Sequence, residues 1–136
     1  MKRIIIIILL IAGIVGASIA YYQFNREHGS NADKKSDFKL SAQELYMSFA
    51  EDESKANEIY LGKLIEVEGK VIHREAISDK ETNLILEVEG EMFGISCQIA
   101  NEEINSQDLS NKIVSIKGEC SGYLNDVVLI RCVLVN

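Results

Sequence analysis

The stretch that decides the fold reads Lys63-Leu64-Ile65-Glu66-Val67-Glu68-Gly69-Lys70-Val71. Apolar and charged side chains alternate along it, which is typical of a β-strand with one buried face and one solvated face. A glycine inside a strand usually marks a bulge or a sharp bend, so Gly69 predicts a long and bent first strand. A strand of this kind can belong to two sides of a small barrel.

Four further strands are predicted, over Leu84 to Glu89, Met92 to Ile99, Ile113 to Glu119 and Asp126 to Val135. The segments between them are polar, and residues 101–111 hold enough apolar side chains for one or two helical turns. Five strands with a helical break before the fourth predict a mainly β domain, a five-stranded barrel of the OB type. An up-and-down β-sandwich is the alternative, although five strands are few for it.

An amphipathic helix is predicted before the barrel, from about Ala42 to Glu58. Ser41 and Glu44 have the spacing of a capping box, in which each side chain bonds the backbone amide of the other residue. Apolar side chains, Leu45 and Phe49 among them, then recur on one helical face. Gly62 lies too far along the chain to cap this helix and is expected in the turn into the first strand.

The N-terminal part has the composition of a membrane anchor, because residues 4–20 form an apolar run of 17 residues after Lys2 and Arg3. A spanning helix needs roughly 20 apolar residues, whereas the apolar part of a signal peptide has about 7–15. The length favours a single transmembrane helix, and Ser18-Ile19-Ala20 keeps a cleaved signal as the alternative. The short basic leader then predicts a single-pass protein of the cytoplasmic membrane with an extracytoplasmic (periplasmic) globular part.

Three segments are therefore expected: an anchor in residues 1–22, with the membrane contacted by residues 4–22, a flexible linker in residues 23–39, and the OB domain in residues 40–136. The linker has almost no apolar residues with which to fold. Without Lys2 and Arg3 the chain has 12 basic and 21 acidic residues, a net charge of about −9. Because phosphate-binding proteins usually present a basic surface, this charge disfavours nucleic acid as a partner without excluding it.

Three cysteines, Cys97, Cys120 and Cys132, have no spacing typical of a zinc site. Three buried free thiols are favoured, and a Cys120–Cys132 disulfide is the alternative. His28 and His73 are isolated, and the sequence shows no catalytic triad, phosphate loop or catalytic carboxylate pair. The chain is therefore expected to be no enzyme and to need neither a metal nor a cofactor.

Three stretches resemble the tRNA_anti-like OB-fold family, a group of small bacterial proteins that often carry an N-terminal membrane helix or lipoprotein signal. They are residues 60–69, Gly94-Ile95-Ser96-Cys97, and above all Gly118-Glu119-Cys120-Ser121-Gly122-Tyr123-Leu124-Asn125-Asp126-Val127-Val128-Leu129. The likeness spans roughly Ser41 to Val135. It implies the OB fold, and it implies single-stranded nucleic acid as one kind of ligand, since the family is named after the anticodon-binding domains of tRNA synthetases. Fold alone does not settle function.

OB barrels bind ligands on the face of their second and third strands and with the loops that join strands one–two and four–five. Those loops are expected at residues 73–83 and 121–125. The candidate ligand-binding residues are Arg74, Lys80, Ser96, Gln98, Tyr123 and Asp126. Phe93 is in phase with Ile95 and is expected in the core.

Tyr123 is expected either to cap its loop or to stack on a ligand, and Asp126 to bond the backbone of the four–five loop. Arg131 interrupts an apolar strand, which predicts an ion pair with Asp126 or with acids of the helix rather than a ligand anchor. The third strand's outward positions carry no cation or aromatic ring. The sequence thus favours a membrane-anchored binding module for a protein or a small polar molecule, with single-stranded nucleic acid as the alternative.

Overall fold

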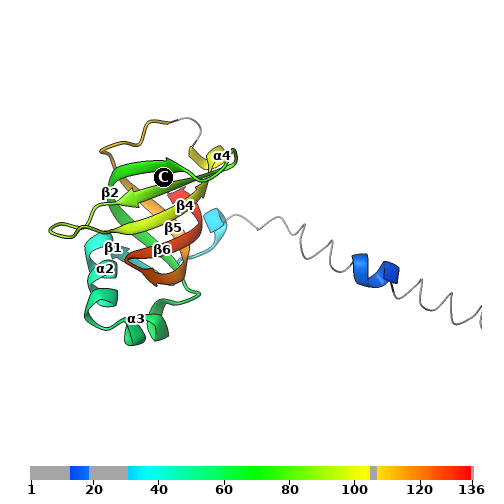
Figure 1. Ribbon diagram of the computed structural model, residues 1–136, viewed down its shortest axis with the longest axis horizontal. Coiled ribbons are helices and arrows are strands. Elements are labelled where there is room, and N and C mark those ends of the chain that lie inside the picture. Colours follow the sequence, from blue (N-terminus) through cyan, green and yellow to red (C-terminus); the bar gives the residue numbers. More distant parts are fainter. Residues whose placement is uncertain (1–12, 19–30, 105–106, 136) are drawn as a thin grey trace, which may run out of the picture.

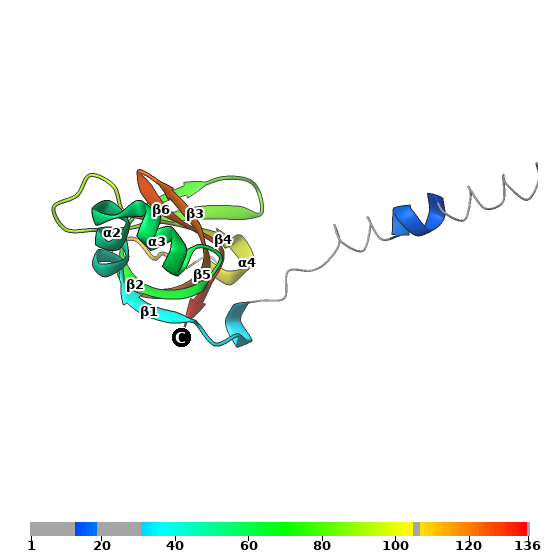
Figure 2. The same cartoon turned by 90° about the horizontal axis from the view of Figure 1, so that it is seen from below.

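The computed structural model describes residues 13–18, 31–104 and 107–135. Figures 1 and 2 show a barrel with two helices at one end and a short helix at the other. Its elements are η1 (Asn31–Asp33), β1 (Phe38–Ser41), α2 (Ala42–Glu51), α3 (Glu53–Tyr60), β2 (Leu64–Ala76), β3 (Glu81–Leu86), β4 (Ile95–Ala100), α4 (Asn101–Ile104), β5 (Ile113–Leu124) and β6 (Asp126–Val135).

Five strands close the barrel in the order β2-β3-β4-β6-β5, and β5 pairs again with β2. The β4–β6 pair is parallel, and the other four pairs around the barrel are antiparallel. This is the strand order of a five-stranded Greek-key barrel, so the predicted OB-type fold is confirmed.

β2 contains a register shift, but it lies beyond Gly69, where a bulge or bend was predicted. Gly69 keeps a regular pairing with Val114, and the register shift lies between Val71 and His73. A Cβ atom on Gly69 would lie 3.0 Å from the Cβ of Ala42 and 3.1 Å from that of Leu86. The glycine therefore allows the start of α2 to pack closely on β2.

The core is built from the side chains that alternate inward along the five strands, closed at one end by α2. The three thiols are free and buried, which confirms that prediction and excludes the Cys120–Cys132 disulfide. Phe93 is 41 % exposed, so its predicted core position is wrong. The largest fully buried side chains are Leu45, Phe49, Ile65, Leu84, Leu86, Ile95, Ile99, Ile104, Ile116 and Leu129.

Strand ends are where prediction and structure differ most. β3 begins at Glu81 and ends at Leu86, because Glu81 already pairs with Ala100 across the sheet. β5 runs to Leu124 through residues that were expected to form a loop, and its hairpin turns at Asn125, which has φ of +73°. Pairing with neighbouring strands therefore sets where these strands begin and end, even where the local sequence is polar. The helical turn predicted after the third strand is present as α4.

The predicted helix is divided at Asp52, which ends α2 and whose side chain caps α3. The capping box of Ser41 and Glu44 forms as predicted. Gly62 directly follows the C-cap Leu61 and has φ of +73°, the left-handed conformation that ends many helices. The prediction that Gly62 lies too late for this role is wrong.

Residues 31–41 pack on the barrel, although residues 31–39 were assigned to the linker; we call residues 31–41 the N-terminal strap. β1 lies parallel to β2 along the edge opposite β5. The buried Lys117 on β5 donates through Nζ to the carbonyl oxygens of Ala32 (3.1 Å) and Lys34 (2.8 Å). Hydrogen bonds thus hold the polar first part of the strap, while Phe38 and Leu40 pack against the core, and the Phe38 ring meets that of Tyr60 edge-on at 5.1 Å.

Glu66 holds the strap from β2. Lys39 Nζ donates to it at 3.1 Å, and Ser36 Oγ donates at 3.3 Å. The hydrogen bond from Lys39 is the main cause of the lowered pKa of the Glu66 carboxyl.

Most of the predicted membrane anchor lies outside the described residues, which include only residues 13–18 of it, in helical conformation. In the part of the chain that is described, we find no helix with the length and apolar character needed to cross a membrane.

Replacement of Lys117 by Met should release the strap. The variant keeps the apolar stem but loses two charge-assisted hydrogen bonds, and relief of the buried charge offsets part of that loss. We expect the free energy of unfolding to fall by about 1–2 kcal/mol and amide exchange to accelerate in residues 31–37, measured by hydrogen–deuterium exchange. Lys63→Met, at an exposed lysine, is the control. Unchanged protection of the strap in Lys117→Met would contradict the assignment.

Candidate functional site

The outward face of β3, β4 and β6 is the surface on which OB barrels bind ligands. Asn83 is paired with Gln98, Ile85 with Ser96, and Ser96 in turn with Val128. Ser96 Oγ donates to Asn83 Oδ1 at 2.9 Å. The side chains of this outer barrel face are Asn83, Ile85, Ser96, Gln98, Val128 and Ile130.

The outer barrel face has no cation on its three strands apart from Arg131. Residues 81–111, which include β3 and β4, contain seven acidic residues and no Lys or Arg. Arg131 forms an ion pair with Glu119 on β5. An ion pair was expected, but with Asp126 or an acid of the helix.

Two of the six predicted site residues, Ser96 and Gln98, lie on this face. Arg74 does not: it pairs with the fully buried Leu84, so it lies on the face that continues the barrel interior. Arg74 was expected in the loop of residues 73–83, but β2 continues to Ala76, and the register shift after Val71 sets the face on which Arg74 lies. Lys80 is exposed in the loop between β2 and β3, where its carbonyl oxygen accepts a hydrogen bond from the Asn101 amide (2.8 Å).

Tyr123 belongs to β5 and packs beneath α2, so its predicted place in a loop is wrong. Its ring stacks on Phe49 with centroids 5.7 Å apart and meets Tyr46 edge-on at 6.0 Å. A hydrogen bond to Tyr123, together with burial and the charges of Glu91 and Asp126, raises the pKa of Tyr46 to about 12. These contacts occupy the ring that was considered for stacking on a ligand.

Asp126 was expected to bond the backbone of its own loop, but its side chain bonds the loop between β3 and β4. Its Oδ1 accepts from the Gly94 amide at 2.7 Å, and the Val127 amide donates to the Gly94 carbonyl at 3.1 Å. A Cβ atom on Gly94 would lie 2.0 Å from the carbonyl oxygen of Leu86, so only glycine fits there. The loop of residues 87–94 is thereby fixed against the β5–β6 hairpin.

Sequence reasoning missed two parts of this surface. Asn83 was assigned to a loop. Side chains alternate between the two faces of a strand, so its position next to the inward Leu84 could have predicted that it faces outward. The role of Gly94 was also not predicted, because it follows only from the close approach to Leu86, which lies eight residues earlier in another strand.

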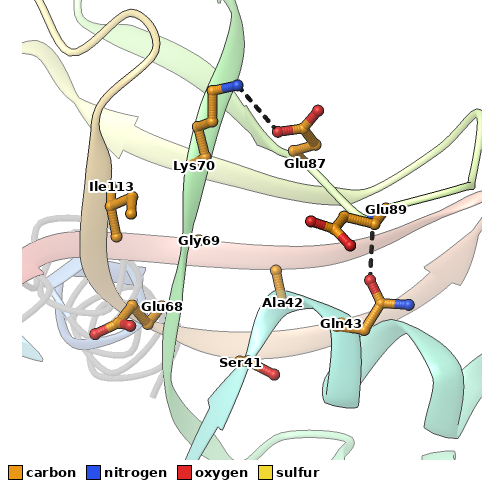
Figure 3. A pocket seen from close by; sticks show the side chains of 9 residues that line it. All are labelled: Ser41, Ala42, Gln43, Glu68, Gly69, Lys70, Glu87, Glu89 and Ile113. Carbon is orange, nitrogen blue, oxygen red and sulfur yellow. Dashed lines mark hydrogen bonds and ion pairs between the residues drawn. The ribbon is translucent and has the colours of Figure 1, made fainter.

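An open groove of about 650 Å³ lies where α2 begins, over Gly69 of β2 (Figure 3). Lys70 Nζ pairs with Glu87 at 3.3 Å, and Gln43 Oε1 accepts from the Glu89 amide at 3.0 Å. One contact thus joins two side chains of the groove, and the other fixes Gln43 to the backbone of the loop between β3 and β4. The lining residues are Ser41, Ala42, Gln43, Glu68, Gly69, Lys70, Glu87, Glu89 and Ile113. Among the described residues, no three His, Cys, Asp or Glu side chains are arranged to hold a metal ion.

The profile of one protein family, described as tRNA_anti-like, matches residues 1–134. No protein of curated function matches the chain. Among solved structures, a lipoprotein from Klebsiella pneumoniae subsp. pneumoniae that is presumed to bind nucleic acid aligns with a TM-score of 0.59 at 14 % identity, over 72 % of this chain and 91 % of that one. At this identity the likeness concerns the fold.

Two other structures align less closely. Asparaginyl-tRNA synthetase from Entamoeba histolytica, in complex with asparaginyl-adenylate, gives a TM-score of 0.40 at 13 % identity over 55 % of this chain and 21 % of that one. The yeast Stn1 and Ten1 structure gives 0.43 at 13 % identity over 79 % and 66 %.

Gly94→Ala tests whether the two loops depend on this close approach. We expect a loss of about 2–4 kcal/mol in the free energy of unfolding, since the new methyl group requires β3 and the loop to separate. Gly90→Ala, in the same loop at φ of +79° with open space around it, should cost only about 1 kcal/mol. Chemical denaturation measures both. Equal losses would contradict the role of Gly94.

Tyr46 predicts a pH dependence. Because the fold favours the protonated phenol, the stabilisation is complete below about pH 10 and is lost as the pH rises from about 10 to about 12. Tyr46→Phe should lower the free energy of unfolding at neutral pH by about 0.5–1.5 kcal/mol and remove this phase. Stability against pH, followed with phenolate absorbance, measures it, and an unchanged alkaline profile in Tyr46→Phe would contradict it.

Proposed function

The chain belongs to the tRNA_anti-like family, and we propose that it is a non-enzymatic OB-fold binding module, anchored to the cytoplasmic membrane with its barrel outside the cytoplasm. Its outer barrel face binds a protein or a small uncharged polar ligand. The observation that carries this proposal is the charge of that face: β3, β4 and the loop between them hold no Lys or Arg. A ligand rich in phosphate would meet carboxylates there without a compensating cation.

The polar groups of the face support the same proposal. Asn83 and Gln98 offer amide groups, which donate to and accept from neutral partners such as peptide bonds, while the buried Ser96 positions Asn83 through the hydrogen bond from its hydroxyl. Ile85, Val128 and Ile130 supply half-buried apolar surface around them. A mixture of neutral polar and apolar side chains is typical of surfaces that bind proteins.

The alternative is single-stranded nucleic acid, supported by the family and by the presumed ligand of the Klebsiella pneumoniae lipoprotein. Binders of this class combine a positive groove with stacking aromatic rings. On this barrel Arg74 lies on the opposite face, and Tyr123 is packed under α2. The alternative therefore has less support than the fold suggests.

A titration of the full chain in detergent with labelled single-stranded DNA and RNA tests the proposal. At low salt we expect no saturable binding in the micromolar range, because β3 and β4 hold no Lys or Arg and Arg131 of β6 is paired with Glu119. Micromolar binding that weakens as salt is added would overturn the proposal.

Two variants test whether the assay would detect oligonucleotide binding at this face. Asn83→Lys/Gln98→Lys places two cations on the outer barrel face and should create salt-sensitive oligonucleotide binding. Ser54→Lys/Ser110→Lys adds the same charge at exposed positions elsewhere and should not. Equal gains in both variants would show that net charge, rather than this face, governs binding.

A further inference from the structure

Three exposed large apolar side chains lie beside the outer barrel face, two on the loop between β3 and β4 and one at the end of β5. Met92 is 90 % exposed, Leu124 81 % and Phe93 41 %. Met92 and Phe93 belong to the loop of residues 87–94, and Leu124 is the last residue of β5 before the hairpin turn. We call these three side chains the apolar tip.

The apolar tip is held in place by the surrounding structure. The Gly94 amide bonds to Asp126, which joins the two loops, and the Glu89 amide bonds to Gln43 of α2. Val88 is buried within the same loop at 3 % exposure. The loop therefore has one anchored apolar side chain, while the next two, Met92 and Phe93, point to solvent from a fixed backbone.

Side chains of this kind suit a docking surface. Aromatic residues and Met are enriched in protein interfaces, and exposed apolar residues gathered on neighbouring loops mark interaction sites more often than scattered ones do. Presentation on a fixed backbone reduces the entropy lost on binding.

The charges around the apolar tip define its partner. Glu87, Glu89, Glu91 and Asp126 lie on the same two loops, and residues 118–130 add no Lys or Arg. Lys70, the cation beside Glu87, is already paired with it. A complementary surface would therefore be basic, and the same charges disfavour nucleic acid, an anionic bilayer and a second copy of this acidic chain.

We propose that the apolar tip is the anchor for a protein partner whose docking surface has an apolar pocket bordered by Lys or Arg. This inference rests on the proposed function and deepens it, since it names the chemistry of the partner and the residues that enter it.

The probe is a random peptide library displayed on phage and selected on the full chain in detergent. Enriched peptides should combine Lys or Arg with apolar residues, and their binding should weaken as salt is added. In Met92→Ser/Leu124→Ser the affinity of these peptides, measured by calorimetry, should fall at least tenfold. Ile72→Ser/Ile113→Ser removes two exposed apolar side chains elsewhere and should leave it unchanged. Thermal melting confirms that both variants are folded.

Several outcomes would overturn the inference: no enrichment, peptides without basic residues, or equal affinity for the tip variant and the native chain. Phosphatidylglycerol vesicles that bind the native chain but not Met92→Ser/Leu124→Ser would overturn it in favour of a lipid surface, and self-association lost in that variant in favour of a second copy. Peptides that lose affinity in Asn83→Lys/Gln98→Lys but not in the tip variant would overturn it while leaving the proposed function intact. Oligonucleotide binding by the native chain would overturn both.

Discussion

β2 has to form hydrogen bonds with three other strands, and the rest of the domain is arranged around that requirement. Its first half pairs with β5 on one edge and with β1 on the other, and its second half pairs with β3. On that second edge the partner changes from β1 to β3 between Glu68 and Val71, and the register shift follows within the β2–β3 pair. Gly69 then leaves room for Ala42, so that α2 can begin directly where β1 ends. Closure of the barrel and placement of its helical cap thus depend on the same few residues.

The strap covers an edge of β2 that the other barrel strands leave unpaired. Without β1, the first half of β2 would have one unpaired edge, because β3 pairs only with the second half. β1 covers that edge, and Lys117 and Glu66 hold the segment that leads to it. An unpaired edge invites pairing with other chains, so the strap also protects the barrel from association through its backbone. The proposed interactions with a partner then use side chains, on the outer barrel face and on the loops beside it.

Elements whose buried residues recur with a regular period were predicted from the sequence. Predictions failed where hydrogen bonds between distant parts of the chain set the ends of a strand or the position of a segment. Alternation identified Ile95, Cys97 and Ile99 as core residues, and it placed Ser96 and Gln98 on the outward face. Phe93 shares that alternation but precedes the strand, whose start is set by its pairing with β3 and β6. Arg74 was expected in a loop, but β2 continues through it, and the register shift after Val71 turns its side chain to the face of Leu84. The strap could not be predicted, because its hydrogen-bond partners lie far along the chain.

The OB fold determines where the side chains of its binding surface lie, but not which side chains these are. Pairing of β3, β4 and β6 fixes where outward side chains lie, whatever those side chains are. Charge at these positions is free to change, since solvated side chains contribute little to the stability of the barrel. On this chain the inherited positions carry amides, a hydroxyl and aliphatic groups, with carboxylates on the adjoining loops. The selectivity of the surface for its partner therefore has to be derived from its own residues, and these favour a basic polypeptide over a polyanion.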